Sequence, residues 1–362
     1  MSIPYLLALH SINGINSKKL ALLIEYFGGA EAAFAQIGSW QDIPELAKDF
    51  SALFEAKKEV DLNRVYEDFL ASGAKILTIE DDNYPELLRE IYDPPYLLFY
   101  LGDLPLADQL YIAVIGARNA TAYGKQVANN MAAGLASQGA WVVSGLARGI
   151  DAAAHKGAMT TGKTLAVLAT GIDMVYPREN KELFEQVVKN GAVISEMPIG
   201  TKPLAYHFPL RNRIISGLCK GLVVVEATKK SGTKHTVDHA LEQGRDIFAV
   251  PGPVFSPLSQ GTHSLIRQQC AKLVENADDV MEEYRMGHLF AEPRFGKQGW
   301  PKQDNLTMQE KHLCEFLIIR QHFDKIAAEL ELSSAELAPL LVLWELRGLI
   351  KQLPGNNYVM NQ

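Results

Sequence analysis

Six short apolar runs alternate with helix-like segments between residues 111 and 250, and this pattern constrains the fold most strongly. Strands buried on both faces appear as continuous apolar runs, and strands that alternate with helices form a parallel sheet covered on both sides. The sequence therefore predicts an α/β core, an extended Rossmann-like doubly wound parallel sheet. The expected strands are 111–116, 141–144, 165–170, 192–195, 222–227 and 246–250, and the expected helices are 124–138, 151–160, 180–190, 212–218, 233–243 and 262–271.

The segments that flank this core predict further domains. Residues 1–75 form an expected small all-α domain that resembles a SAM or helix-hairpin-helix element, although a packing or partner module fits equally well. Residues 76–287 form the Rossmann-like domain, which begins with a strand near Lys75 and an irregular, proline-containing connection to Leu101. Residues 288–305 lack an apolar period and predict a linker. Residues 306–362 predict a winged-helix (DML1-like) domain, in which Ser333 and Glu336 start the third helix.

Charge is distributed unevenly along the chain. The whole protein carries a formal charge of −7, yet residues 111–235 carry fifteen Lys and Arg against seven Asp and Glu. A basic segment within an acidic protein is typical of a polyanion-binding site, although a solvated basic face is the alternative. The acidic balance of residues 306–362 favours a protein contact there over a DNA contact.

Cysteine usage and the first residues bear on the cell compartment. Cys219, Cys270 and Cys314 are far apart and form no CxxC pair, so we expect neither disulfides nor a metal site. The N-terminus lacks the basic region of a signal peptide, and no apolar run reaches about 18 residues. We therefore expect a cytoplasmic protein with no membrane partner.

Small and basic residues follow four of the expected strands. Because the carboxyl ends of parallel strands meet at one sheet edge, we expect these turns to form a phosphate-binding edge, with Arg148 paired to Asp151. The first turn is not GxGxxG and lacks a following ribose-binding acid, so a dinucleotide is disfavoured and no cofactor is expected. The candidate phosphate-binding residues are Gly116, Arg118, Ser144, Gly145, Arg148, Gly171, Lys230, Ser231, Gly232, Thr233 and Lys234.

Aromatic and basic residues adjoin one another in the segment HFPLRNR. His207 and Phe208, with Tyr206 before them, offer stacking faces, and Arg211 and Arg213 flank Asn212 at the expected start of a helix. Aromatic rings beside a basic groove suit sequence-tolerant binding of single-stranded DNA. The alternative is that Phe208 is a core residue and that both arginines pair with nearby acids.

One apparent nucleotide motif is rejected. Residues 157–164 match GxxxxGK[ST], but a P-loop follows a strand and precedes a helix, whereas this match follows a helix and precedes a strand. The sequence also lacks HExxH and GxSxG motifs, so we predict no catalytic site and a protein that is not an enzyme.

The runs VIGARNATAYG, SGLARGIDAAAH, FPLRNRIISGL and ALEQGRDIFAVPG resemble the DNA-processing protein A (DprA/Smf) family over roughly residues 75–285. The resemblance implies a homodimer that binds single-stranded DNA and loads the RecA recombinase on it during natural transformation. It assigns DNA contacts to Arg118, Phe208, Arg211 and the basic loops around Lys202 and Lys230. It places Leu265 and Ile266 at dimer or RecA contacts.

Several positions depart from the family pattern. Ala117 replaces the usual serine, LATG replaces LGxG, and SGTKHTV adds Lys234 and His235 to the basic edge. His263–Ser264 stands where an asparagine is expected before Leu265, at the expected assembly surface.

Two other functions remain open. A nucleotide phosphoribohydrolase of the lysine-decarboxylase-like (LOG) type shares this sheet, but Thr236 stands where its catalytic glutamate should be. A repressor of double-stranded DNA that acts through the winged helix is disfavoured by the acidic balance of that domain.

Overall fold

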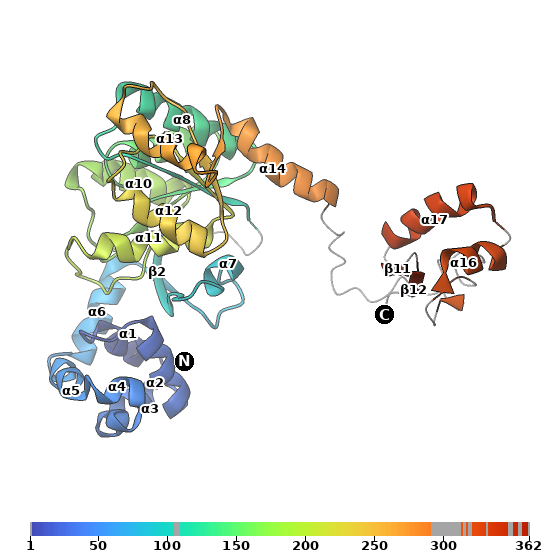
Figure 1. Cartoon of the computed structure of the whole chain (residues 1–362). Helices are drawn as coiled ribbons and strands as arrows, with labels where there is room; N and C mark the ends of the chain where they lie inside the picture. Colours follow the sequence, from blue (N-terminus) through green and yellow to red (C-terminus); the bar gives the residue numbers. More distant parts are fainter. Residues whose placement is uncertain are drawn as a thin grey trace. The chain divides into compact units, whose positions relative to one another are not determined.

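The computed structural model describes residues 2–104, 109–290, 313, 316–317, 321–330, 332–346, 350–353 and 357–360. The chain forms two compact units, Met1–Glu283 and Tyr284–Gln362 (Figure 1). The domain boundaries expected from the sequence stay a prediction. α14 runs to Phe290, three residues into the expected linker, and residues 291–305 lie outside the described residues.

Short helices make up the N-terminal part of the first unit. The Asn16 side chain accepts a hydrogen bond from the Lys19 amide at 3.0 Å and so caps the second helix, which ends at Gly28 in the left-handed region. Leu20 and Trp40 share one hydrophobic core with Phe99 and Leu168 of the sheet, so the helices pack directly on it. The elements are α1 (Ile3–Ser11), α2 (Ser17–Phe27), α3 (Ala30–Ala35), η1 (Ile37–Asp42), α4 (Pro44–Ala47), α5 (Phe50–Lys58) and α6 (Leu62–Ser72).

A nine-stranded sheet in the order β1-β2-β6-β5-β4-β3-β7-β8-β9 forms the centre of the unit. The strands are β1 (Lys75–Thr78), β2 (Leu97–Gly102), β3 (Tyr111–Ile115), β4 (Trp141–Ser144), β5 (Thr164–Leu168), β6 (Ala192–Ser195), β7 (Gly221–Val224), β8 (Asp246–Ala249) and β9 (Lys272–Leu273). Strands β3 to β9 pair in parallel, which confirms the α/β core.

The connection between Lys75 and Leu101, which the sequence predicts to be irregular, contains the strand β2. β2 pairs antiparallel with both β1 and β6. Its residues suit this position because Leu97 and Phe99 enter the core on one sheet face and Leu98 enters the core on the other. Pro94 and Pro95 end before the strand begins, so neither interrupts it.

Helices cover both faces of the sheet. α9 (Ile150–Ala158) and α10 (Lys181–Asn190) pack on the face that the N-terminal helices share, and α8 (Ala122–Ser137) packs against α9. α7 (Glu86–Arg89), α11 (His207–Leu218) and α12 (Thr233–Glu242) pack on the opposite face. The remaining elements are η2 (Arg178–Asn180), η3 (Pro257–Ser259), α13 (Gln260–Arg267) and α14 (Ala277–Phe290).

Helix α11 begins five residues earlier than the sequence predicts. The sequence places a helix start near residue 212, yet His207 is already helical. Pro209 lies in the first turn, where backbone N–H groups have no acceptor within the helix. The lack of an N–H group on proline therefore costs no hydrogen bond there. The segment HFPLRNR is therefore helical, and this determines where its arginines point.

The second unit has the helix and hairpin order of a winged helix. It contains β10 (Gln321–His322), α16 (Phe323–Glu329), α17 (Ser334–Leu346), β11 (Ile350–Leu353) and β12 (Asn357–Met360), with sheet order β10-β12-β11. The Ser333 amide and hydroxyl donate to Glu336 Oε2 at 3.0 and 2.6 Å, as the predicted helix start requires. The predicted first helix of this domain lies mostly outside the described residues. Among the helices that can be described, none has the length and apolar character needed to cross a bilayer.

Candidate nucleic-acid interface

A cavity of about 760 Å³ lies where β3 and β7 end, beside the first turns of α11 and α12. We call it the strand-end groove. It brings together eight of the predicted site residues, which are Gly116, Arg118, Phe208, Arg211, Lys230, Ser231, Gly232 and Thr233. A smaller cavity shares Arg118 and Phe208 with the groove and is lined also by Gly145, Arg148 and Tyr176.

An arginine and two aromatic rings form one wall of the groove. The Arg118 guanidinium carbon lies 4.7 Å from the centroid of the Phe208 ring, within the range of a cation–π contact. The Tyr176 ring lies 5.7 Å from the Phe208 ring at an interplanar angle of 60°. Arg118 and Tyr176 are exposed, so this wall offers both a positive charge and aromatic faces.

Arg211 lines the groove but is almost fully buried. The residue is only 3% exposed, and its Nη1 donates to the carbonyls of Gly145, at 2.8 Å, and Val167. Burial lowers the pKa of Arg211 to about 10, against the opposing effect of Asp151. Burial likewise raises the pKa of Asp151, and the positive charge of Arg211 counters this. The pair fixes the turn at Gly145, where a Cβ atom would lie 2.6 Å from the Arg211 guanidinium.

Donor groups gather where α12 begins. Lys230 is exposed at the groove, and the Ser231 hydroxyl is buried with no hydrogen-bond partner among the described residues. Ser231, Gly232 and Thr233 line the groove at the N-terminus of α12, where free amides and the helix dipole favour an anion. The geometry provides a place for a phosphate beside the aromatic wall.

The sequence matches the family described as DNA recombination-mediator protein A over residues 75–285. The chain belongs to the DNA recombination-mediator protein A family. Residues 318–356 match the DprA winged helix domain. The chain is 45% identical to the DNA processing protein DprA of Bacillus subtilis over 224 residues, which are 61% of this chain and 75% of the relative. It is 47% identical to that of Streptococcus pneumoniae over 208 residues, 57% of this chain and 73% of the relative.

Two solved structures of the family resemble the chain. DNA processing protein A of Streptococcus pneumoniae matches with a TM-score of 0.69 and 38% identity, over 77% of this chain and 97% of that one. The Helicobacter pylori protein, described by its single-stranded DNA binding mode, matches with a TM-score of 0.54 and 29% identity, over 59% of this chain and 98% of that one. The family supports a recombination-mediator role for the chain, and the phosphoribohydrolase alternative is not favoured.

In this family member, Arg213 points away from the groove. Residues two positions apart on an α-helix lie on nearly opposite sides, so Arg211 and Arg213 cannot both face one groove. Arg213 Nη2 donates to both Glu196 carboxylate oxygens at 2.6 Å, and its Nε lies 3.5 Å from Asp93 Oδ2. The structure therefore places Arg213 in a buried ion pair, as the alternative reading of HFPLRNR allowed.

The predicted Arg148–Asp151 pair does not form. Arg148 makes a bidentate ion pair with Glu179, with both distances at 2.7 Å. Asp151 Oδ2 instead accepts from the Gly145 amide at 3.2 Å, because Asp151 is buried in the first turn of α9. Arg148 still lines the small cavity beside the groove.

The other predicted residues lie around the groove without lining its main cavity. Ser144 is buried and donates to the Val114 carbonyl at 2.7 Å, and Gly171 is buried with its amide donating to Thr201 at 3.0 Å. His207 is buried at the start of α11, and Lys202 is exposed in the loop before it. Lys234 and Leu265 line a separate cavity of about 320 Å³, and Ile266 is half-buried nearby on α13.

Tyr176 and His235 are groove residues that the site prediction missed. His235 follows the predicted Lys234, and the sequence adds it to the basic edge without including it among the candidate site residues. Tyr176 follows a strand end by several residues, and an aromatic residue in a long loop gives little indication of where its ring lies. The GxxxxGK[ST] match runs from α9 into β5, which confirms that it is not a P-loop.

Proposed function

We propose that this chain binds single-stranded DNA in the strand-end groove without transforming it chemically, and loads RecA on that strand during natural transformation. The observation that carries the proposal is that the Arg118–Phe208–Tyr176 wall and the donor groups of Ser231–Thr233 line one and the same cavity. We further propose that it acts in the cytoplasm.

The groove suits a single strand because it combines two kinds of contact. Arg118, Lys230 and the start of α12 offer positive charge and N–H donors to phosphates. Phe208 and Tyr176 offer faces on which a base can stack. Base faces are covered in a duplex, so the aromatic contribution is available only to an unpaired strand. The description of the Helicobacter pylori relative by its single-stranded DNA binding mode supports the same ligand.

We also propose a homodimer, with Leu265 and Ile266 at its dimer or RecA contacts. In support, Leu265 lines a cavity together with Val237 and Leu241, and the Leu241 side chain is exposed. β9, at the adjacent sheet edge, has only two residues and leaves Leu273 exposed. Apolar side chains grouped at one edge suit an interface.

Fluorescence anisotropy with oligo-dT and with a duplex of equal length, each at two salt concentrations, tests the groove proposal. We expect tighter binding of the single strand and a log–log salt slope of about −0.7 per phosphate contact. Equal affinity for the duplex would contradict the proposal. Release of a base from nucleoside monophosphates would show that the protein is an enzyme after all.

A further inference from the structure

A second cavity, of about 500 Å³, lies between the N-terminal helices and the pair α11–α12. We call it the α2–α12 cavity. Its lining includes Lys18, Tyr92, Leu210, Arg213, His239 and Arg245.

The same two helices line both cavities. On α11, Pro209 and Asn212 line the strand-end groove, whereas Leu210 and Arg213 line the α2–α12 cavity. On α12, Thr236 lines the groove and His239, one helical turn further on, lines the cavity. The cavity therefore lies one turn away from the groove along α12, and the exposed Leu210 side chain is part of its lining.

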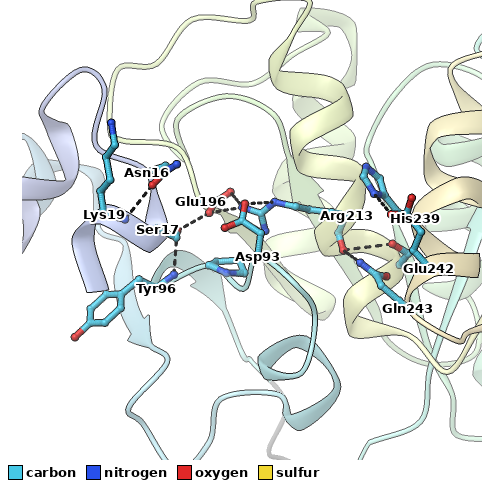
Figure 2. Close-up of polar contacts among 12 residues, drawn as sticks. Asn16, Ser17, Lys19, Asp93, Tyr96, Glu196, Arg213, His239, Glu242 and Gln243 are labelled. Atoms are coloured by element: carbon cyan, nitrogen blue, oxygen red, sulfur yellow. Dashed lines mark hydrogen bonds and ion pairs between the residues drawn. The ribbon is translucent and has the colours of Figure 1, made fainter. Parts of the chain in front are cut away.

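A polar network holds the wall of this cavity in place (Figure 2). The Ser17 hydroxyl, at the start of α2, donates to Glu196 Oε1 at 2.8 Å, and Glu196 holds Arg213 from the other side. The Gln243 side chain donates to the Arg213 carbonyl at 3.1 Å. The cavity is thus framed by α2, the loop at Asp93 and helices α11 and α12 before any ligand enters.

Several polar atoms of this frame have unused hydrogen-bonding capacity. Within the described part of the chain, no hydrogen-bond partner is present for Arg213 Nη1, Arg245 Nε, Asp93 Oδ1 or Gln243 Oε1, all of which are buried. Arg213 as a whole is 8% exposed. Buried polar groups in folded proteins are nearly always paired, so two free donors and two free acceptors around one cavity indicate a ligand that has both.

The charges of the cavity oppose a phosphate as that ligand. Lys18, Arg213 and Arg245 are balanced by three carboxylates that line the same space. These are Glu90, Asp93 and Glu242. A neutral, planar group with donors and acceptors along its edge fits better, and the edge of a nucleobase has this character.

Tyr92 supplies a face for such a group. Its side chain is 91% exposed, and the Lys18 ammonium lies 3.4 Å from the ring centroid. An aromatic ring exposed beside a cavity offers a stacking surface that tolerates any base.

We propose that the α2–α12 cavity takes a nucleobase, stacked on Tyr92. The base can come from a DNA strand that leaves the strand-end groove and passes Leu210, and in that case the proposal rests on the proposed function. A free nucleotide is the other source of the same chemistry. In either case the phosphate stays at the mouth of the cavity, because the three carboxylates repel it from the interior.

A length series separates these sources. Purine-containing oligonucleotides of about 4 to about 16 nucleotides are titrated against the wild type, Tyr92→Ala, Tyr92→Phe and Tyr26→Ala. Tyr26, on α2, is the matched control, because it is also an exposed tyrosine but does not line the cavity. Urea unfolding of each variant checks that stability is unchanged.

For a strand-derived base, we expect Tyr92→Ala to weaken long oligonucleotides about 5-fold or more and to leave the shortest unchanged. Tyr92→Phe and Tyr26→Ala should match the wild type. For a free nucleotide, we expect AMP or GMP to bind the wild type and not Tyr92→Ala, with no dependence on strand length.

An unchanged affinity of Tyr92→Ala for every oligonucleotide and both nucleotides would overturn the proposal. So would an equal loss at all lengths, because that would report a general disturbance. If the wild type bound no oligonucleotide, the proposed function would fail, and the nucleotide titrations alone would decide whether the cavity is a base site.

Discussion

The guanidinium carbon of Arg118 and the ring centroid of Phe208 lie 4.7 Å apart, although one residue follows β3 and the other belongs to the first turn of α11. The contact joins the turn after β3 and the start of α11 into one continuous surface. On this surface a positive charge and an aromatic face can engage the backbone and the base of the same nucleotide.

Replacement of Arg118 by alanine should remove one phosphate contact. We expect weaker binding of oligo-dT and a salt slope that is smaller in magnitude by about 0.7. The measurement is anisotropy across a salt series, with Arg64→Ala as a control because Arg64 lies on α6, away from the groove. An unchanged slope would remove Arg118 from the site. Arg211→Ala is a poorer test, because Arg211 is buried and its loss would disturb the turn at Gly145.

Replacement of Phe208 by alanine should remove a stacking surface. We expect a loss of about 1–3 kcal/mol in binding free energy for single-stranded DNA, with little change in the salt slope. Phe208→Tyr keeps the ring and should bind almost as the wild type does. Tyr206→Ala serves as the control, since Tyr206 is exposed next to Phe208 but does not line the groove. Equal losses in Phe208→Ala and Tyr206→Ala would contradict a specific role for Phe208.

The buried pair Glu196–Arg213 should matter for stability, and Arg213 should contact no phosphate in the strand-end groove. Both side chains are about nine-tenths buried. Glu196→Ala leaves the buried Arg213 charge with only the more distant Asp93 as a partner and should cost about 3–5 kcal/mol in the free energy of unfolding. The double variant Glu196→Leu/Arg213→Met should recover part of this loss. Urea unfolding measures both effects. A folded Arg213→Met protein whose DNA salt slope is smaller in magnitude than that of the wild type would instead place Arg213 at a phosphate of the DNA.

Stability should fall on acidification because of buried histidines. Burial, with the nearby charge of Arg211, lowers the pKa of His155 from 6.5 to about 3. Below about pH 6.5 the unfolded chain therefore binds a proton at His155, whereas the folded chain does not until the pH approaches 3. The free energy of unfolding is highest above pH 6.5 and decreases as the pH falls towards 3. We expect a slope of up to about 1.4 kcal/mol per pH unit from His155, with His10 adding in the same direction because burial lowers its pKa too. Urea unfolding between pH 7 and pH 5 should show a smaller slope in His155→Gln than in the wild type, and equal slopes would contradict the assignment.

The proposed dimer predicts an effect of Leu265→Glu. A carboxylate in the apolar cavity at α13 should shift the protein to monomer in analytical ultracentrifugation. Ser137→Glu, an exposed change at the end of α8, should leave the mass unchanged. A wild type that sediments as a monomer would contradict the dimer itself.

Local pattern was sufficient to predict much of the fold. β4 and β6 have the predicted bounds, and each of the other predicted core strands and helices exists. These elements were predictable because burial on one or both faces gives a regular spacing of apolar residues in the sequence. The groove was also predictable in outline, since parallel strands bring their carboxyl ends to one edge. β2 was missed because the two prolines before it resembled a loop, and a pairing partner that lies far along the chain leaves no local signal.

Tertiary structure decided what each side chain does at that edge. Arg211 and Arg213 have the same chemistry in sequence, but the early start of α11 sends one to the buried lining of the groove and the other to Glu196. Tyr176 and Phe208 meet only after folding, as do Lys18 and Tyr92. Composition and period report which residues are buried and which strands pair in parallel. Where a side chain points depends on the residue at which its helix begins, and which distant residue it meets depends on the packing between elements. Neither can be read from the residues nearby in the sequence.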